Sequence, residues 1–336
     1  MSAPIYYDTD ADLSLIQTKR VAFIGYGNQG AAQSKNLRDS GVAQIVIGNR
    51  EDSYKAAAIA DGFRVVSIPE AAAWGEVVFL LIPDEAQPEV FREQIRPYLR
   101  PGTTLVVASG YNVAFGLLDL PEELDVVMVA PRMIGAGVRD RFLRGEPYPC
   151  FVAVERNQSG QALAVALSIA RGIGATRGGA IGSSALEEAA LDLFSEQAIW
   201  PVILVTLRTA YEVLHEAGFS DEAILYEMYL SKEPAEVLER AAEHGLFGQL
   251  TFHSHTSQYG QLRAITRDDG TWLRERFRRV LHDDILSGRF AREFSDVQTG
   301  GLEALEKLRA QALTTPLARA EATLLSTKGG VSQPQS

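Results

Sequence analysis

The chain has 336 residues, of which 46% are hydrophobic and 22% are charged, and its formal net charge at pH 7 is −11. This composition is ordinary for a soluble globular protein of one or two domains. The negative charge argues against a surface for nucleic-acid phosphates, because such surfaces cluster Lys and Arg. Any bound nucleotide is therefore expected to be a cofactor held in a pocket.

Cys150 is the only cysteine, which excludes a disulfide framework and zinc sites built from several thiolates. The N-terminal segment 1–16 carries acidic residues where a signal peptide carries basic ones. No apolar run approaches the roughly 20 residues that span a bilayer. The sequence therefore predicts a cytoplasmic protein.

Short β-branched runs alternate with Ala-rich helical segments through residues 20–182. This alternation is typical of βαβ units in an α/β fold, where helices cover both faces of a parallel sheet. The strand signals then stop, and the chain reads as almost continuous helix up to residue 325. We expect a doubly wound parallel sheet in residues 1–183, an all-α domain in 184–327 and a disordered tail in 328–336.

The first strand-like run, RVAFIG, leads into GYGNQG, which has the spacing G-x-G-x-x-G. A helical segment follows, and a second strand-like run lies about 20 residues on, which is the context of a Rossmann-type dinucleotide turn. The glycines allow backbone N–H groups to approach a pyrophosphate at the helix N-terminus. The alternative is a tight glycine turn without a ligand. The predicted cofactor residues here are Gly25, Tyr26, Gly27, Asn28, Gln29 and Gly30.

The end of the second strand usually offers Asp or Glu to the ribose hydroxyls of NAD. This chain has Asn49 and Arg50 there, followed by Glu51, Asp52 and Ser53. Arg50 and Ser53 suit a 2′-phosphate, although Glu51 and Asp52 would repel one if they pointed inward. We therefore predict NADPH rather than NADH, with a solvated surface arginine as the alternative for Arg50.

The segment LLIPDEAQPEVF contains an apolar strand that ends in Pro-Asp-Glu. Open α/β sheets bind ligands at the carboxyl ends of their parallel strands, so Ile82, Pro83 and Asp84 are assigned to the cofactor site. Asp84 and Glu85 suit the cap of the following helix equally well.

Asp192 and Glu196 lie four residues apart in LDLFSEQ, among aliphatic and aromatic residues. On a helix this spacing places both on one face, whereas Glu187 and Glu188, a turn earlier, are expected to be solvated. Carboxylates in apolar surroundings need a partner, which can be a hard cation, a buried Arg or Lys, or a backbone cap. The spacing alone leaves these partners open.

Further polar positions interrupt the helical half of the chain. Glu227 stands among Ile, Leu, Tyr and Met residues, and Ser231 lies four residues after it. The segment TFHSHTSQYG brings together His253, Ser254 and His255. Two histidines at this spacing can bind a metal or move protons, but on a loop they are more often surface residues.

With these residues in place, the sequence resembles the ketol-acid reductoisomerases, which are NADPH- and magnesium-dependent enzymes of branched-chain amino-acid synthesis. The resemblance runs from GYGNQG and NLRDSG through LIPDEAQPEVF to DLFSEQ, HSHTSQYG and SGRFARE, nearly the whole chain, and the length resembles the short form. It implies a knotted helical domain and a homodimer, or an assembly of dimers, with active sites at the interface. The family moves an alkyl group of a 2-hydroxy-2-alkyl-3-keto acid at two magnesium ions and then reduces the product with NADPH.

The resemblance implies roles for individual residues. Asp192 matches the acid that bridges the two metals, and Glu196 matches an acid of the first metal. Glu227 matches an acid that the partner subunit supplies, so the implied metal ligands are these three carboxylates. Ser254 matches a serine that hydrogen-bonds the substrate carboxylate.

The chain departs from the family pattern around the metals. Ser231 replaces the second acid of the partner helix, and Ser109, which with Gly110 is assigned to the cofactor site, replaces a histidine. Arg132 replaces a lysine, and His255 replaces an acid in the serine loop. Two divalent ions close together repel strongly, so fewer carboxylates weaken chiefly the second ion's site. We therefore expect one Mg²⁺ rather than two.

Alkyl migration depends on both metals, whereas hydride transfer needs a nicotinamide, a polarised carbonyl or imine and a proton source. Arg132 is assigned as the polarising clamp and His253 or His255 as the proton donor. The leading hypothesis is an NADP(H)-dependent reductase of this family that acts on a small 2-keto acid or a related ketone or imine. The alternatives are a working ketol-acid reductoisomerase with a rebuilt metal site and an NADP-binding protein without turnover.

Overall fold

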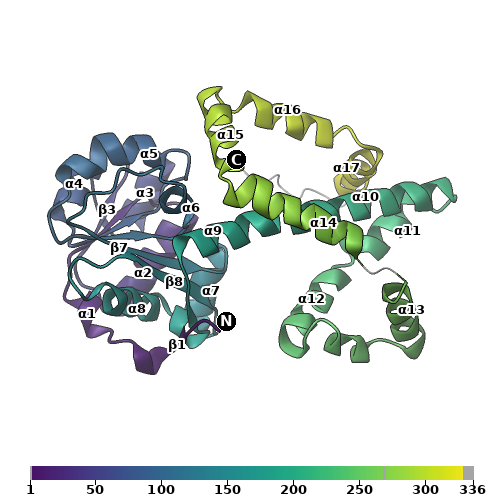
Figure 1. Cartoon of the computed structure of the whole chain (residues 1–336), viewed down its shortest axis with the longest axis horizontal. Helices are drawn as coiled ribbons and strands as arrows, with labels where there is room; N and C mark the ends of the chain where they lie inside the picture. Colours follow the sequence, from purple (N-terminus) through teal and green to yellow (C-terminus); the bar gives the residue numbers. More distant parts are fainter. Residues whose placement is uncertain (1, 268–269, 328–336) are drawn as a thin grey trace. The chain divides into compact units, whose positions relative to one another are not determined.

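The computed structural model describes residues 2–267 and 270–327 (Figure 1). The chain divides into two compact units, Met1–Asp192 and Leu193–Ser336. The boundary expected near residue 183 stays a prediction, and the tail expected at 328–336 lies outside the described residues.

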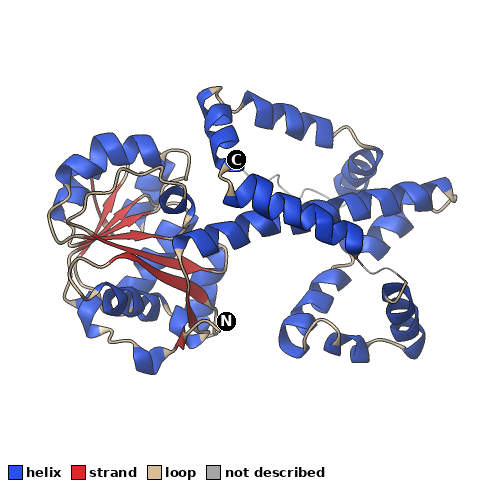
Figure 2. Ribbon diagram, viewed as in Figure 1, coloured by secondary structure: helices blue, strands red, loops and turns tan. Residues whose placement is uncertain are grey.

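A mixed nine-stranded sheet forms the centre of the first unit, with the strand order β1-β9-β8-β7-β6-β5-β2-β3-β4. Helices cover both of its faces (Figure 2). The strands are β1 (Ile5–Tyr6), β2 (Val21–Ile24), β3 (Ile45–Gly48), β4 (Arg64–Val66), β5 (Val77–Leu80), β6 (Thr104–Val107), β7 (Asp125–Pro131), β8 (Cys150–Arg156) and β9 (Ala180–Gly182).

Alternate residues of the central strands supply the two hydrophobic cores of this unit. Phe23 of β2 and Phe79 of β5 stack on one face of the sheet with their ring centroids 4.3 Å apart. Ile24 and Leu80, the next residue of each strand, belong to the core on the other face. Both faces are buried, which is why these strands read as continuous apolar runs. The doubly wound architecture predicted from that pattern is confirmed.

The predicted parallel pairing is present through the centre of the sheet, and antiparallel pairs occur on the β1 side of β7. Strands β2 to β7 pair in parallel, but β8 runs antiparallel to β7, with Pro131 opposite Cys150. After β7 the chain forms helix α7 and returns as β8, which lies beside β7 and runs in the opposite direction. Apolar periodicity cannot reveal strand direction, because a strand buried on both faces looks the same in either direction. The strands β1, β4 and β9 have only two or three residues each, which is too few to show a periodicity in the sequence.

The helices of the first unit mostly follow strands, as in βαβ units. They are α1 (Ser14–Gln17), α2 (Asn28–Asp39), α3 (Ser53–Ala60), α4 (Ile68–Trp74), α5 (Gln87–Val90), α6 (Tyr111–Ala114), α7 (Gly135–Arg144), α8 (Ala162–Ile173) and α9 (Ala185–Phe194). Short 3-10 or π turns are η1 (Asp8–Asp10), η2 (Phe91–Ile95), η3 (Arg96–Tyr98) and η4 (Ala175–Arg177).

The described part of the second unit contains helices and turns but no strand, as predicted. Its helices are α10 (Trp200–Glu216), α11 (Asp221–Leu225), α12 (Glu233–His244), α13 (His255–Ile265), α14 (Thr271–Arg279), α15 (Arg289–Thr299), α16 (Glu303–Ala312) and α17 (Pro316–Thr327). The π or 3-10 turns are η5 (Ser195–Ile199), η6 (Tyr226–Leu230), η7 (Gly248–Phe252) and η8 (Val280–Leu286).

Residues Ala185–Glu216 form one continuous helix of 32 residues. By length and composition this helix could cross a membrane, so the expectation that no segment is long enough was wrong. A single such helix is weak support for a membrane span, because the core helix of a soluble protein meets the same criterion. The cytoplasmic location stays a prediction.

Candidate functional site

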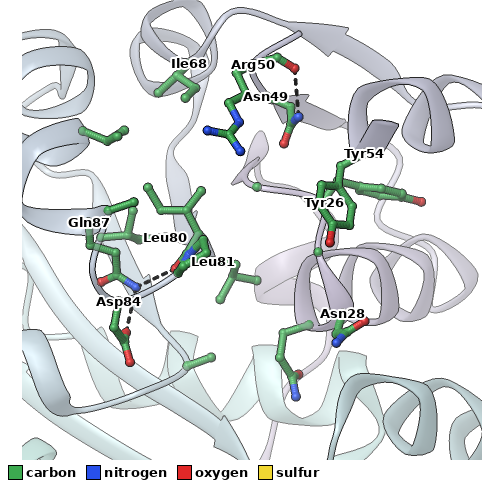
Figure 3. A pocket seen from close by; sticks show the side chains of 18 of the residues that line it. Tyr26, Asn28, Asn49, Arg50, Tyr54, Ile68, Leu80, Leu81, Asp84 and Gln87 are labelled. Atoms are coloured by element: carbon green, nitrogen blue, oxygen red, sulfur yellow. Dashed lines mark hydrogen bonds between the residues drawn. The ribbon is translucent and has the colours of Figure 1, made fainter. Parts of the chain in front are cut away.

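A cavity of about 580 Å³ opens at the carboxyl ends of β2, β3 and β5 in the first unit (Figure 3). β2 lies between β3 and β5, so the sheet order reverses there, and open α/β sheets bind ligands at such a point. The volume is in the range of small-molecule sites. The predicted cofactor residues that line it are Gly25, Tyr26, Gly27, Asn28, Gln29, Asn49, Arg50, Ile82, Pro83, Asp84 and Ser109.

The glycine turn after β2 is shaped by close backbone approach. Gly25 has φ +99°, and a Cβ added there would lie 2.7 Å from the carbonyl oxygen of Leu81. A Cβ on Gly30 would lie 2.3 Å from the carbonyl oxygen of Gly25, so Gly30 is needed for packing and does not line the cavity. Gly27 has nothing within 4 Å of an added Cβ. Helix α2 starts after Gly27 without a side-chain cap, so its first N–H groups can bind an anion.

Tyr26 belongs to the same turn, but its hydroxyl group serves as an anchor. The phenol donates a hydrogen bond to Asp61 Oδ2 over 2.8 Å, and Lys35 Nζ lies 2.7 Å from the same oxygen. Burial raises the pKa of Tyr26, so the phenol keeps its proton and donates. Tyr26 lines the cavity, while its hydroxyl group joins the turn to Asp61, the C-cap residue of helix α3.

Arg50 points into the cavity from the end of β3 (Figure 3). Its side chain is 84% exposed, and Nε lies 2.9 Å from Asp52 Oδ2. Asp52 also caps helix α3 by accepting the N–H groups of Tyr54 and Lys55. Glu51 pairs with Lys55, so each of the acids that could repel a phosphate has a cationic partner. Ser53 is the first residue of α3 and does not line the cavity.

Asp84 follows β5, and its carboxyl group is held by buried amides. Gln87 Nε2 donates to Asp84 Oδ1 over 3.1 Å, and Asn112 Nδ2 donates to Gln87 Oε1 and to the Asp84 carbonyl group, over 3.0 Å each. The side chain does not cap α5, whose N-cap residue is Ala86. Burial, together with the charges of Glu85, Glu188 and Asp192, raises the pKa of Asp84 to about 6.

Replacing Asp84 with Asn should stabilise the protein relative to wild type more at neutral pH than at pH 4. The folded-state pKa is about 6 against an ordinary value of 3.8, so the folded protein binds this proton more tightly than the unfolded chain. The wild type therefore loses stability as the pH rises from about 4 to about 6, by about 2 kcal/mol for a partly exposed group. The difference in unfolding free energy between Asp84→Asn and wild type should grow by that amount, as measured by urea unfolding from pH 4 to pH 8.

The matched control is Glu89→Gln, which removes an exposed carboxylate from the adjacent helix α5. Its stability difference from wild type should stay nearly constant over this pH range. A constant difference for Asp84→Asn as well would show that Asp84 has an ordinary carboxyl group.

Arg132, Glu188 and Asp192 form an ion-pair cluster in the first unit. Arg132 Nη1 lies 2.6 Å from Glu188 Oε1, and Nη2 lies 2.7 Å from Asp192 Oδ1. Glu188 Oε2 accepts the N–H group of Gly110 over 2.7 Å. One buried carboxylate thus joins the loop after β6, the loop after β7 and helix α9. Gly110 does not line the cavity. Its backbone packs closely against helix α9, because an added Cβ would lie 2.2 Å from the Ala185 carbonyl oxygen.

Glu188 was expected to be solvated, and this prediction was wrong. Its residue exposure is 2%, and burial raises its pKa against the opposing effects of the Gly110 N–H group and Arg132. Neighbouring Glu187 is exposed, as expected. A signal was available in the sequence, since Glu188 lies four residues before Asp192 and therefore on the same helix face.

The Arg132 guanidinium keeps the capacity to bind another anion. Two of its five N–H donors face Glu188 and Asp192, and it lies 5.1 Å above the centre of the Phe151 ring. Its side chain is 30% exposed. The arrangement suits a clamp for a substrate carboxylate or carbonyl group.

Asp192 can supply a metal with an oxygen ligand, since its side chain is 46% exposed and Arg132 contacts only Oδ1. Glu196 in turn η5 and Glu227 in turn η6 are both exposed rather than buried among the apolar residues around them. Within residues 2–267 and 270–327, no group of three or more His, Cys, Asp or Glu residues could hold a metal ion.

The histidine and serine segment of the second unit starts a helix, although a loop was expected. Ser254 is the N-cap of α13, and its Oγ accepts the N–H group of Ser257 over 3.2 Å. His255 is the first helical residue and is exposed, whereas the His253 ring lies 2.9 Å from Gln249 Oε1. Ser254 and His255 thus begin one helix, and the capping role of Ser254 explains its place there.

Comparisons with known proteins cover both units. The family described as acetohydroxy acid isomeroreductase, NADPH-binding domain, matches residues 15–179. The family described as ketol-acid reductoisomerase, C-terminal domain, matches residues 186–328. The first match contains the cavity and Arg132, and the second contains Glu188 and Asp192 of α9.

Individual relatives match over nearly their full length. A protein named ketol-acid reductoisomerase (NADP(+)) from Methanopyrus kandleri is 41% identical over 310 residues, which is 91% of this chain and 93% of the relative. One named putative ketol-acid reductoisomerase 3 from Saccharolobus solfataricus is 40% identical, covering 94% of this chain and 95% of the relative. The solved structure of an NADH-preferring ketol-acid reductoisomerase from an uncultured archean is 32% identical with a TM-score of 0.89, covering 98% of this chain and all of the other. The chain is therefore an oxidoreductase of the ketol-acid reductoisomerase family, with that family's NADPH-binding domain.

Proposed function

We propose that the protein is a working ketol-acid reductoisomerase, which converts acetolactate to 2,3-dihydroxy-isovalerate with NADPH. The observation that carries this proposal is the Arg132, Glu188 and Asp192 cluster, which is joined through Gly110 to the loop of Ser109 on the cavity wall. A charge-binding group and a dinucleotide cavity thus adjoin in one unit. The relatives named as ketol-acid reductoisomerases support this alternative better than the leading hypothesis of a reductase with a changed substrate.

The cavity fits a dinucleotide phosphate. The uncapped start of α2 and the open space at Gly27 suit the pyrophosphate, and Arg50 suits the 2′-phosphate. Bound NADPH would supply the hydride. The residues of the chain would then hold the nicotinamide near Asp84 and Ser109, on the side of the cavity formed by the ends of β5 and β6.

Replacing Arg50 with Ala should weaken NADPH binding about tenfold and leave NADH binding within about twofold. A charge-assisted contact to the 2′-phosphate contributes about 1.5 kcal/mol, and NADH lacks that phosphate. The measurement is the fluorescence titration of both cofactors. Arg92→Ala, which removes an exposed arginine of turn η2, is the control and should change neither Kd. Equal weakening for both cofactors would mean that Arg50 supports the fold of the β3 loop rather than NADP specificity.

We propose that Mg²⁺ is held by Asp192 and Glu196 together with Glu227 of the partner subunit, with one ion bound more tightly than a second. Bound Mg²⁺ would polarise the substrate carbonyl group. Arg132 would orient the substrate carboxylate. The resemblance implies that Ser254 hydrogen-bonds this carboxylate, and His253 or His255 is proposed as the proton donor. Ser231, whose Oγ accepts the Glu233 N–H group, adds no charge, which supports the weaker second ion.

A homodimer is part of this proposal. Helix α10 exposes large apolar side chains in the single chain, namely Trp200, Ile203, Leu204, Val205 and Val213. Exposed apolar side chains of this size on one helix support an interface that a partner covers. A second chain would cover it and bring the partner's acid to the active site.

A second candidate function is the reduction of a keto acid without alkyl migration. The specific observation in its favour is the Arg132 contact with Asp192 Oδ1, because a cation already faces the predicted metal ligand. The two functions are separated by assaying NADPH oxidation with acetolactate and with its rearranged 3-hydroxy-2-keto isomer, each with and without Mg²⁺. Magnesium-dependent turnover of both, at about 1 s⁻¹ or faster, is expected for the reductoisomerase. Turnover of the rearranged isomer alone would favour the second candidate.

A further inference from the structure

We propose that Gln29 is a positioning residue that couples the dinucleotide-binding turn to the loop that carries Arg132. Gln29 was predicted to bind the cofactor, and it does line the cavity. Its side-chain amide, however, is committed elsewhere, because Nε2 donates a hydrogen bond to the Met133 carbonyl oxygen over 2.9 Å. Met133 directly follows Arg132, so this contact joins the start of α2 to the residue next to the proposed substrate clamp.

The orientation of the Gln29 amide is fixed from the helix side. Gln33, one turn later in α2, donates through Nε2 to Gln29 Oε1 over 3.0 Å, and Gln33 is fully buried. The Gln29 oxygen is thus occupied by a donor, which leaves its nitrogen to face the Met133 carbonyl group. The two amides form a short chain of hydrogen bonds from the core to the Arg132 loop.

The backbones on either side of this contact are in close approach. A Cβ added to Gly135, the first residue of α7, would lie 2.1 Å from the Asn28 carbonyl oxygen. Further along the same two helices, Arg139 Nη1 donates to Asn36 Oδ1 over 2.8 Å. Helix α2 therefore contacts the α7 segment at two places, through Gln29 beside the cavity and through Asn36 further along the helix.

This packing has a functional consequence. An anion bound at the start of α2 would lie beside the backbone of Asn28 and Gln29, and the Gln29 amide would transmit its position to Met133 and Arg132. Cofactor binding would then order the Arg132 loop for the substrate. The role of Arg132 rests on the proposed function, whereas the coupling between the two loops does not.

Gln29→Met tests the proposal, since it keeps the side-chain length but removes the donor. NADPH affinity should stay within about threefold of wild type, while kcat/KM for the keto acid should fall about tenfold. In hydrogen exchange, NADPH should protect both 25–31 and 132–137 in the wild type, but only 25–31 in the variant. Gln17→Met is the matched control, because Gln17 Nε2 makes the same kind of bond to the Ser40 carbonyl oxygen away from the cavity. It should behave as wild type.

Two outcomes would overturn the proposal. NADPH affinity that falls as far as kcat/KM would make Gln29 a cofactor ligand, and wild-type-like protection of 132–137 in the variant would show that the loops are not coupled through it. If Gln29→Met does not fold, Gln29→Glu replaces it, because a carboxylate still accepts from Gln33 but opposes the Met133 carbonyl oxygen. If the wild type does not turn over acetolactate, the proposed function fails, and the exchange experiment still decides the coupling.

Discussion

Replacing Arg132 with Ala lowers kcat/KM for the keto acid by at least about 100-fold and destabilises the protein by about 3 kcal/mol. The stability loss arises because the Glu188 side chain is 3% exposed and would keep a buried charge without its cationic partner. The activity loss arises because the substrate carboxylate would lose its clamp. Steady-state kinetics and urea unfolding measure the two effects on the same preparation.

Arg132→Lys separates the charge of this residue from its geometry. A single ammonium group can pair with Glu188 or with Asp192 but cannot bridge both with parallel N–H donors, so most of the stability should return and part of the activity loss should remain. Arg144→Ala, at an exposed arginine of α7 that lies 3.5 Å from Glu146, is the control and should change neither property. An Arg132→Ala variant with wild-type kcat/KM would remove Arg132 from the active site.

Asp192→Asn should lower magnesium-dependent turnover at least about 100-fold and leave the NADPH Kd within about twofold. The amide keeps an oxygen that can accept the Arg132 N–H group, so the ion-pair cluster loses a charge but not its shape. Removing a carboxylate ligand directly lowers the affinity of the site for a hard cation such as Mg²⁺. Calorimetric titration with Mg²⁺, followed by titration with NADPH, measures both affinities.

Glu187→Gln is the matched control for Asp192→Asn, because it neutralises an exposed acid on the same helix. Its Mg²⁺ affinity and turnover should equal those of the wild type. Equal loss of NADPH and Mg²⁺ binding in Asp192→Asn would assign Asp192 a structural role instead.

The cofactor half of the site was predictable because its information is local. The turn needs residues without a side chain at Gly25 and Gly30, which lie within a few positions of each other. The strands on either side of the turn are recognisable as apolar runs. Arg50 and Asp84 follow such runs directly. The tertiary structure then needs only parallel pairing of β2, β3 and β5 to bring these segments to one edge of the sheet.

The charged half was less predictable because its contacts join distant parts of the chain. Glu188 accepts the N–H group of Gly110, which lies 78 residues earlier, and pairs with Arg132, which lies 56 residues earlier. Helix periodicity indicates which residues share a face but not what covers that face. The family resemblance supplied Asp192 and Arg132 separately, and only the structure shows that they contact each other.

The most direct test of the proposed function is to identify the product from acetolactate that is ¹³C-labelled in the methyl group on its C2 carbon. The protein, NADPH and Mg²⁺ are incubated with this substrate, and the position of the label is read by NMR. A reductoisomerase moves the labelled methyl group to C3 before the hydride arrives, so the label should appear in the isopropyl group of 2,3-dihydroxy-isovalerate. A label that stays on C2, in 2,3-dihydroxy-2-methylbutyrate, would show reduction without migration, and this result, or the absence of any reduced product, would contradict the proposed function.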